Sequence, residues 1–289
     1  MRRLVAILAA SLLTLALAGP ALAAPGSSGN HAVMYYLSLG DSLAAGQQPI
    51  GDPANNHVTY DGYTDQLYEI AKATYPKLRH VRLGCSGETT TSFVTGVDTR
   101  CTYRHGSQLD DAVRFLRAHR QFVAFVTIDL GWNDFPCQDS PACIPPGLAT
   151  IGANLPGILD TLRKAAGPDV PIVGASIYDP FLAYWLAGQP DLAQLSVALL
   201  AGPGGLNDQI SAIYASRGMP VADVEGAFNT ERWEPLVPLS GYPVSVPLNV
   251  ATLCAYTWEC APAPYGPDHH ANHDGYRAMA LAFAAVLGL

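Results

Sequence analysis

Apolar residues along the chain alternate between short continuous runs and runs with helical spacing. The continuous runs are typical of strands buried on both faces of a parallel sheet, and they fall at residues 33–40, 80–84, 122–131, 170–178 and 219–224. Positions with i, i+3, i+4, i+7 spacing indicate helices, which fall in segments starting at Ser107, around residues 155–162, and from Asp274. This alternation predicts an α/β fold, a three-layer α/β/α sandwich with a five-stranded, mainly parallel sheet.

The segments between these elements show no internal repeat and no interdomain linker. Stretches rich in proline and glycine, at residues 135–147, 202–205 and 234–267, are interpreted as loops over a single domain that spans residues 33–289. The last stretch is long, so we expect it to have a function or to be tethered by a disulfide.

The N-terminus has the pattern of a secretory signal peptide. Arg2 and Arg3 precede an uncharged stretch over residues 4–24 that ends in small residues suited to cleavage. An uncleaved anchor is the alternative, since this stretch is about one bilayer span long, but Gly19-Pro20 favours cleavage. We predict a signal peptide at 1–23, a flexible leader at 24–32, and a secreted protein with no other segment apolar enough to span a membrane.

Composition narrows the possible partners. The 289 residues have a formal net charge of −8 and include only three lysines, whereas binding to a nucleic-acid backbone needs a basic patch. The high apolar fraction of 49% rules out a disordered chain. We therefore expect a globular protein that does not bind nucleic acid, and we predict that it is a monomer.

Six cysteines in an exported chain indicate disulfides. Six cysteines allow fifteen connectivities, but these six form three pairs that are local in sequence. We predict the bonds Cys85–Cys101, Cys137–Cys143 and Cys254–Cys260. None of the six forms a CxxC motif, which argues against a zinc ribbon or a thioredoxin-like site.

Candidate catalytic groups follow several of the predicted strands, at the edge where ligands bind in parallel sheets. Ser42 lies on a glycine-led turn after the first strand, Gly87 follows the second, and Asn133 follows the third. A hydroxyl there suits a nucleophile, while backbone N–H groups and an asparagine amide suit an oxyanion. Taken one by one, the same residues are equally typical of a helix cap or of ordinary turns.

A fourth candidate segment precedes the last helix, where Asp268, His269, His270 and His273 lie close together in sequence. Histidine is the usual base for activating a hydroxyl, and a nearby aspartate can orient its ring. The alternative is a metal site built from these four residues, although no HExxH motif accompanies them.

In their order, these signals resemble the four blocks of the SGNH hydrolase superfamily, also called GDSL esterases and lipases. The blocks here are Gly40-Asp41-Ser42-Leu43, Ser86-Gly87-Glu88-Thr89, Gly131-Trp132-Asn133-Asp134 and Asp268-His269-His270. The likeness spans residues 33–288, and Tyr178-Asp179-Pro180-Phe181 and Val221-Ala222-Asp223-Val224 also resemble secreted actinobacterial members. The resemblance implies a flavodoxin-like sandwich and a secreted serine esterase or lipase that needs no metal or cofactor. The absence of GxSxG separates the chain from the α/β-hydrolases.

The resemblance also implies a role for each matching residue. Ser42 is the nucleophile and His270 the base, chosen over His269 and His273 because the residues that follow it match the family best. Asp268 orients His270, although the family block often reads Asp-x-x-His and position 267 is proline here. The oxyanion hole consists of the N–H groups of Ser42 and Gly87 and the amide of Asn133.

Two other functions stay open: a metal-dependent hydrolase that uses the histidine cluster, and a secreted binding domain without catalysis. The substrate is a small-molecule or lipid ester, and the sequence does not choose among lipids, sugar esters and polymers. Several aromatic residues are candidates for an acyl pocket or for ordinary core, namely Tyr178, Phe181, Trp185, Phe228 and Trp233.

Overall fold

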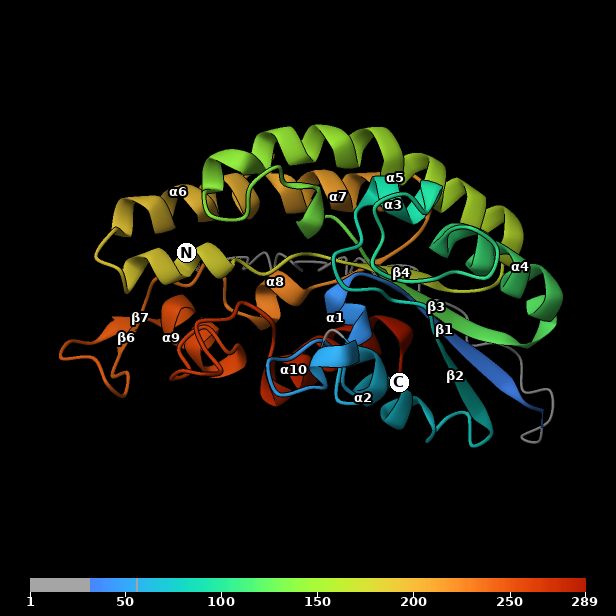
Figure 1. Cartoon of the computed structure of the whole chain (residues 1–289), viewed down its shortest axis with the longest axis horizontal. Helices are drawn as coiled ribbons and strands as arrows, with labels where there is room; N and C mark the ends of the chain where they lie inside the picture. The colour runs from blue at the N-terminus through green and yellow to red at the C-terminus, as the bar shows by residue number, and fades with distance from the viewer. Residues whose placement is uncertain (1–31, 56) are drawn as a thin grey trace, which may run out of the picture.

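The computed structural model describes residues 32–55 and 57–289, and a five-stranded parallel sheet lies at its centre (Figure 1). The strand order is β2-β1-β3-β4-β5. The strands are β1 Met34–Gly40, β2 Leu78–Arg82, β3 Val123–Asp129, β4 Ile172–Ala175 and β5 Val221–Ala222. Each pairing between neighbours in this sheet is parallel, as the continuous apolar runs predicted.

Helices cover both faces of the sheet, which confirms the three-layer prediction (Figure 1). One layer contains α3 Thr90–Thr95, α4 Gln108–His119, α5 Ile144–Ala166, α6 Pro190–Leu200 and α7 Leu206–Ala215. The other contains α1 Ser42–Ala45, α2 Tyr63–Ala71, α8 Val224–Ala227, α9 Leu248–Tyr256 and α10 His273–Leu287. Short 3₁₀ turns join them at Pro53–Asn55 (η1), Arg120–Phe122 (η2), Trp132–Asp134 (η3), Pro141–Cys143 (η4) and Pro180–Trp185 (η5).

The core lies on the two sides of the sheet because the central strands are apolar on both faces. All seven residues of β3 are buried. In β1, Leu37 and Leu39 pack into the layer of α4 and α5, whereas Tyr36 packs into the layer of α2 and α10. Alternate side chains of a strand point to opposite faces, so continuous apolar sequence is what a doubly covered sheet requires.

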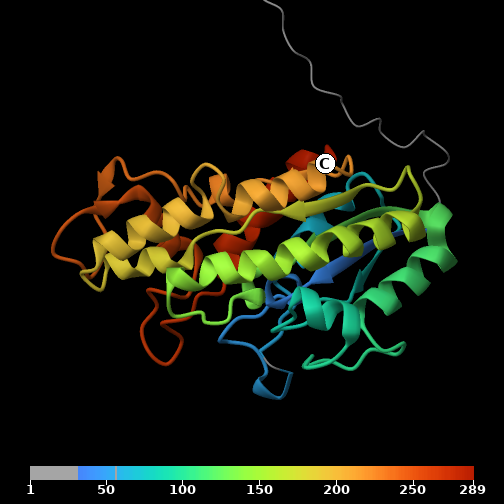
Figure 2. The same cartoon turned by 90° about the horizontal axis from the view of Figure 1, so that it is seen from above.

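Helix α5 packs between α4 and α7 in the first layer (Figure 2). Its inward face includes Ile151, Leu155 and Leu162, all buried. By length and composition alone the segment Pro141–Ala166 is apolar enough to cross a membrane, which the sequence analysis did not expect. The predicted signal peptide and, apart from Ala32, the predicted leader lie outside the described residues.

The structure corrects the prediction in three regions. Within the stretch at 135–147, interpreted as loop, η4 begins at Pro141 and α5 at Ile144. The stretch at 234–267, interpreted as loop, contains helix α9 and a small antiparallel hairpin of β6 Leu236–Val237 and β7 Val246–Pro247. Its proline and glycine content masked the short apolar face of α9, on which Val250 and Leu253 are buried. The fourth and fifth strands are also shorter than predicted. The fourth ends at Ala175, and soon after it the backbone of Ile177 bonds to the side chain of Asn207 instead of to a neighbouring strand.

Candidate active site

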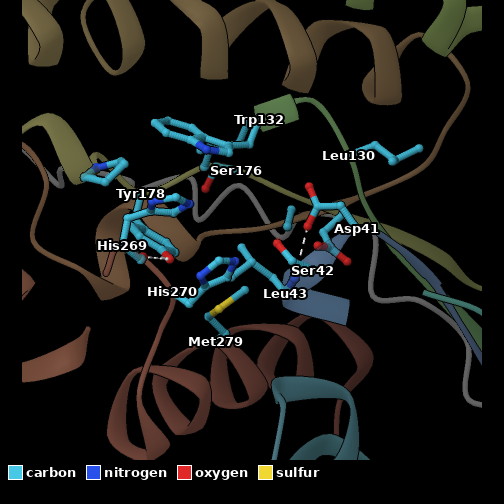
Figure 3. Close-up of a pocket in the computed structure, with 14 residues that line it drawn as sticks. Asp41, Ser42, Leu43, Leu130, Trp132, Ser176, Tyr178, His269, His270 and Met279 are labelled. Atoms are coloured by element: carbon cyan, nitrogen blue, oxygen red, sulfur yellow. Dashed lines mark hydrogen bonds between the residues drawn. The ribbon is translucent and has the colours of Figure 1, made fainter. Parts of the chain in front are cut away.

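Ser42 lies immediately after β1, at the carboxyl edge of the sheet. The neighbours of β1 are β2 on one side and β3 on the other, so this edge is the topological switch point where ligands bind in such sheets. The side chain of Asp41 accepts a hydrogen bond from the amide of Leu43 (3.0 Å) and caps α1. This cap turns the chain sharply, so that Ser42 lines a pocket while remaining mostly buried (Figure 3).

Asp41 is part of a buried acid pair that the sequence analysis did not identify. Gly40 has a φ of +132°, and a side chain there would overlap the backbone of Asp129. The amide of Asp41 donates to the carbonyl of Asp129 (3.2 Å), and the carboxyl groups of the two residues are close enough for each to affect the ionisation of the other. Tyr63 adds a hydrogen bond from its hydroxyl to Asp129 Oδ1 (2.7 Å).

Burial dominates the electrostatics of this acid pair. It raises the pKa of Asp41 to about 6 and, together with the charge of Asp41, raises the pKa of Asp129 well above its usual value. Two adjacent buried carboxyl groups cannot both be ionised cheaply, so the pair retains a proton near neutral pH. Burial and mutual repulsion thus keep a proton on the acid pair beside the turn that presents Ser42.

Asp268 and His270 form a hydrogen-bonded pair on the loop before α10. Asp268 Oδ1 lies 2.8 Å from His270 Nδ1 and also accepts the backbone amide of His270 at 2.8 Å. Burial opposes the ionisation of Asp268, but the hydrogen bonds and charge of His270 outweigh it and lower the pKa of the carboxyl. With Nδ1 held by Asp268, the other ring nitrogen of His270 is left for chemistry in the pocket.

The other two histidines of the predicted cluster have different surroundings. His269 stacks on His270, with ring centroids 4.6 Å apart, and burial lowers its pKa to about 4, so its ring is neutral. His273 faces away and pairs with Asp61 at 2.8 Å. Among residues 32–55 and 57–289, no three histidine, cysteine or acidic side chains gather as a metal-binding group.

Ser42 and His270 line the same pocket, whose other walls are mostly apolar (Figure 3). No hydrogen bond joins the two side chains in the part of the chain that the structure describes, which is common for catalytic pairs without substrate. Tyr178 also lines this pocket. Its hydroxyl donates to the carbonyl of His269 (2.7 Å) and so helps to hold the histidine loop.

The two remaining oxyanion candidates lie close by but do not line this pocket. The Asn133 amide donates to the carbonyl of Glu88 (3.1 Å) and to Asp41 Oδ2 (3.3 Å). Gly87 follows β2 with a φ of +80°, a conformation that few other residues adopt. The sequence blocks thus converge on one sheet edge, and hydrogen bonds join three of them through Asp41, Glu88 and Asn133.

All three predicted disulfides are present. Cys85–Cys101 adjoins Gly87, and Cys137–Cys143 follows Asn133 by a few residues. Cys254–Cys260 closes a loop that contains Trp258, whose amide donates to the carbonyl of His270 (3.1 Å). The amide of Asp268 in turn donates to the carbonyl of Trp258 (3.3 Å). This third disulfide therefore closes a loop that is hydrogen-bonded to the Asp268–His270 pair.

The aromatic candidates for an acyl pocket divide into three groups. Tyr178 lines the Ser42 pocket, and Phe181 lines a second pocket beside it. Phe228 stacks on Tyr178 at 4.2 Å within the core, while Trp185 and Trp233 contact each other at 5.7 Å. These last three are not among the residues that line either pocket.

Ser42 at a strand end thus faces the Asp268–His270 pair across an apolar pocket. This arrangement is the one found in carboxylic ester hydrolases built on a parallel sheet, and the protein belongs to that class. The chain belongs to the GDSL-like lipase/acylhydrolase family, whose sequence model matches residues 38–278. This match confirms the resemblance that the four blocks indicated.

Solved structures of similar fold include an esterase and a lipase. A catalytic mutant of an acetylxylan esterase from Geobacillus stearothermophilus superposes with a TM-score of 0.52 at 17% identity, covering 89% of this chain and 94% of the esterase. An extracellular lipase from Streptomyces rimosus gives a TM-score of 0.52 at 19% identity, covering 88% of this chain and 98% of the lipase. Comparison with curated proteins gives no significant sequence match.

Proposed function

We propose that this protein is a secreted serine esterase that hydrolyses carboxylic esters through an acyl-enzyme on Ser42. One observation carries the proposal: Ser42 and His270, far apart in sequence, line one pocket at the switch point of the sheet, and Asp268 holds the ring of His270. A nucleophile, a base and a group that orients the base are the three parts that such a reaction needs.

The first half of the reaction acylates Ser42. His270 accepts the hydroxyl proton of Ser42 at Nε2 as the oxygen attacks the ester carbonyl. Asp268 keeps the Nδ1–H group oriented and stabilises the imidazolium that forms. The tetrahedral intermediate then collapses, the bond to the alcohol oxygen breaks, and His270 returns the proton to the departing alcohol.

The second half releases the acid. Water loses a proton to His270 while attacking the acyl carbonyl, and the intermediate expels Ser42, which regains its proton. In both halves the negative oxygen is stabilised by the backbone N–H groups of Ser42 and Gly87 and by the amide of Asn133. We infer that the oxyanion displaces the longer of the two Asn133 hydrogen bonds, the 3.3 Å contact with Asp41. Loss of one such donor typically costs about 10²–10³ in kcat.

Export is the proposed route of the mature enzyme. Three disulfides support it, because such bonds persist in oxidising compartments. The signal-peptide pattern at residues 1–23 and the fold shared with an extracellular lipase are compatible with it.

The test is hydrolysis of p-nitrophenyl butyrate by the mature protein and by Ser42→Ala. We expect the variant to lose about 10⁴-fold or more in kcat while its circular dichroism stays unchanged, because only one buried oxygen is removed. Equal rates in both proteins would remove Ser42 from the mechanism and leave the histidine cluster as the place to search.

A further inference from the structure

A second pocket opens beside the Ser42 pocket and shares part of its wall. Trp132, Pro180 and His269 line both cavities. The inner cavity, at Ser42, has a volume of about 30 Å³, and the outer one has a volume of about 330 Å³. Only the outer cavity is as large as typical small-molecule sites, which begin at roughly 300 Å³.

The two cavities differ in chemistry as well as in size. Apolar side chains such as Leu43, Ile177 and Met279 line the inner one. The outer one is lined by Gln138, Glu259 and other polar groups in addition to aromatic rings. An ester has two halves, an acyl group and an alcohol, and only the outer cavity has room for a bulky one.

Glu259 is the free acceptor of the outer cavity. Its side chain is half-buried, and its carboxylate makes no hydrogen bond or ion pair with residues 32–55 or 57–289. Burial and the nearby charge of Asp268 raise its pKa. Burying a carboxylate without a partner costs free energy. A ligand that donates hydrogen bonds to Glu259 therefore gains more binding free energy than it would by donating to a fully solvated carboxylate.

Trp132 is the free donor at the boundary between the cavities. Its indole N–H group is buried, and no residue in the described part of the chain accepts its hydrogen bond. The ring is 9% exposed and contacts Phe135 and Phe181, at centroid distances of 5.1 and 5.3 Å. Indole nitrogens usually find a partner when buried, so a small turn of the ring toward the outer cavity lets a ligand oxygen supply the missing acceptor.

A donor and an acceptor without partners restrict the chemistry of the ligand. An alkyl alcohol satisfies neither Glu259 nor Trp132, and a quaternary ammonium group satisfies at most the charge of Glu259. A phosphodiester headgroup is repelled by Glu259 and by Asp139, which also lines the outer cavity. A hydroxyl-rich alcohol can donate to the carboxylate and accept from the indole at once.

We propose that the outer cavity binds the alcohol half of the ester and that this alcohol is neutral and polyhydroxylated, as in an acylated sugar, with Trp132 and Glu259 as its hydrogen-bonding partners. The inference rests on the proposed serine-esterase function and specifies the substrate class of that site. The acyl group then occupies the narrow cavity, so a short acyl chain is expected.

The test compares alcohols that carry one and the same acetyl group. The substrates are methyl 6-O-acetylglucopyranoside, cyclohexylmethyl acetate of similar size without hydroxyls, and acetylcholine, with p-nitrophenyl acetate as the reference ester. We expect kcat/KM for the sugar acetate to exceed the values for the other two alkyl acetates by at least about tenfold, since two hydrogen bonds are gained. A higher value for cyclohexylmethyl acetate or for acetylcholine would overturn the assignment.

Variants show whether the named residues produce this preference. In Glu259→Gln and in Trp132→Phe, the kcat/KM ratio of sugar acetate to p-nitrophenyl acetate should fall by about tenfold. Glu231→Gln, the same change at an exposed glutamate, should leave the ratio unchanged. An unchanged ratio in both pocket variants would overturn the proposal. If only one of the two variants folds well enough to be measured, an unchanged ratio in that variant would overturn it.

The same assays separate a wrong substrate class from a wrong function. Turnover of p-nitrophenyl acetate that depends on Ser42, without a preference for the sugar acetate, would reject only the polyhydroxylated alcohol. Turnover that does not depend on Ser42 would reject the serine mechanism and the substrate assignment together.

Discussion

The two halves of the candidate active site are held in different ways. Ser42 and the acid pair below it lie at the ends of β1 and β3, where the register places Gly40 opposite Asp129 in the middle of the sheet. The Asp268–His270 pair lies on a loop, held by its own hydrogen bonds and by Trp258. One half depends on the core of the fold and the other on local contacts.

This difference predicts which substitutions affect stability and which affect only activity. A residue fixed by neighbouring strands cannot move without disturbing the sheet, so substitutions beside Ser42 should affect stability as well as activity. A residue fixed by a loop can be displaced at little cost in stability, yet a displacement of about 1 Å can cost as much as 10²-fold in rate. Substitutions in the loop half should therefore separate activity from stability.

The largest effect is expected for the proposed base, His270. His270→Ala should lower kcat by about 10⁴-fold with little change in the free energy of unfolding, because the ring is held mainly by one aspartate. His273→Ala is the matched control, since His273 also pairs with an aspartate at 2.8 Å but faces away from the pocket. p-Nitrophenyl butyrate hydrolysis and urea unfolding measure the two quantities.

The contrary result is equally informative. If His269→Ala abolished turnover and His270→Ala preserved it, the base would be His269, and the pairing with Asp268 would not mark the catalytic ring. The assignment chosen from the sequence would then be wrong.

The sequence identified candidate residues in both halves of the site. Asp268 and His270 are two residues apart, so their pairing needs only local chain geometry, and Ser42 closely follows a recognisable strand. Asp129 was not identified because it ends an apolar strand, and only the register of β1 with β3 brings it beside Asp41. Non-local register of this kind leaves no short motif in the sequence.

The outer cavity was missed for the same physical reason. Trp132 occurs inside one of the recognised blocks, but nothing in the sequence gives it a role. Its neighbours in the cavity, Tyr184 and Glu259, come from η5 and from the loop after α9, and α9 itself was interpreted as loop. Cavities formed where loops meet depend on tertiary packing more than on any local pattern.

A smaller effect is expected in the strand-borne half, and it depends on pH. The folded pKa of Asp41 is about 6, above the usual 3.8, so the stabilising effect of its proton is complete below pH 3.8 and is lost as pH rises through 6. The difference corresponds to about 3 kcal/mol. Asp41→Asn cannot lose this proton and can still cap α1, so its stability relative to the wild type should rise by about that amount between pH 4 and pH 8.

Urea unfolding at several pH values tests this expectation. Burial and Asp41 also raise the pKa of Asp129. The titration of Asp129 therefore adds to the loss of wild-type stability with rising pH and does not oppose it. A constant difference in stability between Asp41→Asn and the wild type from pH 4 to pH 8 would show that the pair holds no extra proton in the folded state.

The smallest effects on activity should come from removing disulfides. Replacing Cys254 and Cys260 by alanine removes a loop closure of six residues, which stabilises the fold by about 2 kcal/mol, whereas the 16-residue closure Cys85–Cys101 stabilises it by about 3 kcal/mol.

The losses of activity should follow the reverse order. Trp258 bonds directly to the backbone of His270, whereas the Gly87 side of the site is held by the edge of the sheet. We expect a three- to tenfold loss of kcat from the Cys254–Cys260 variant, about 1 kcal/mol, and a smaller loss from the Cys85–Cys101 variant. The opposite result would be that the variant that loses more stability also loses more activity. The two halves of the site would then depend on the fold in the same way, and Ser42 on its strand would not differ in this respect from the Asp268–His270 pair on its loop.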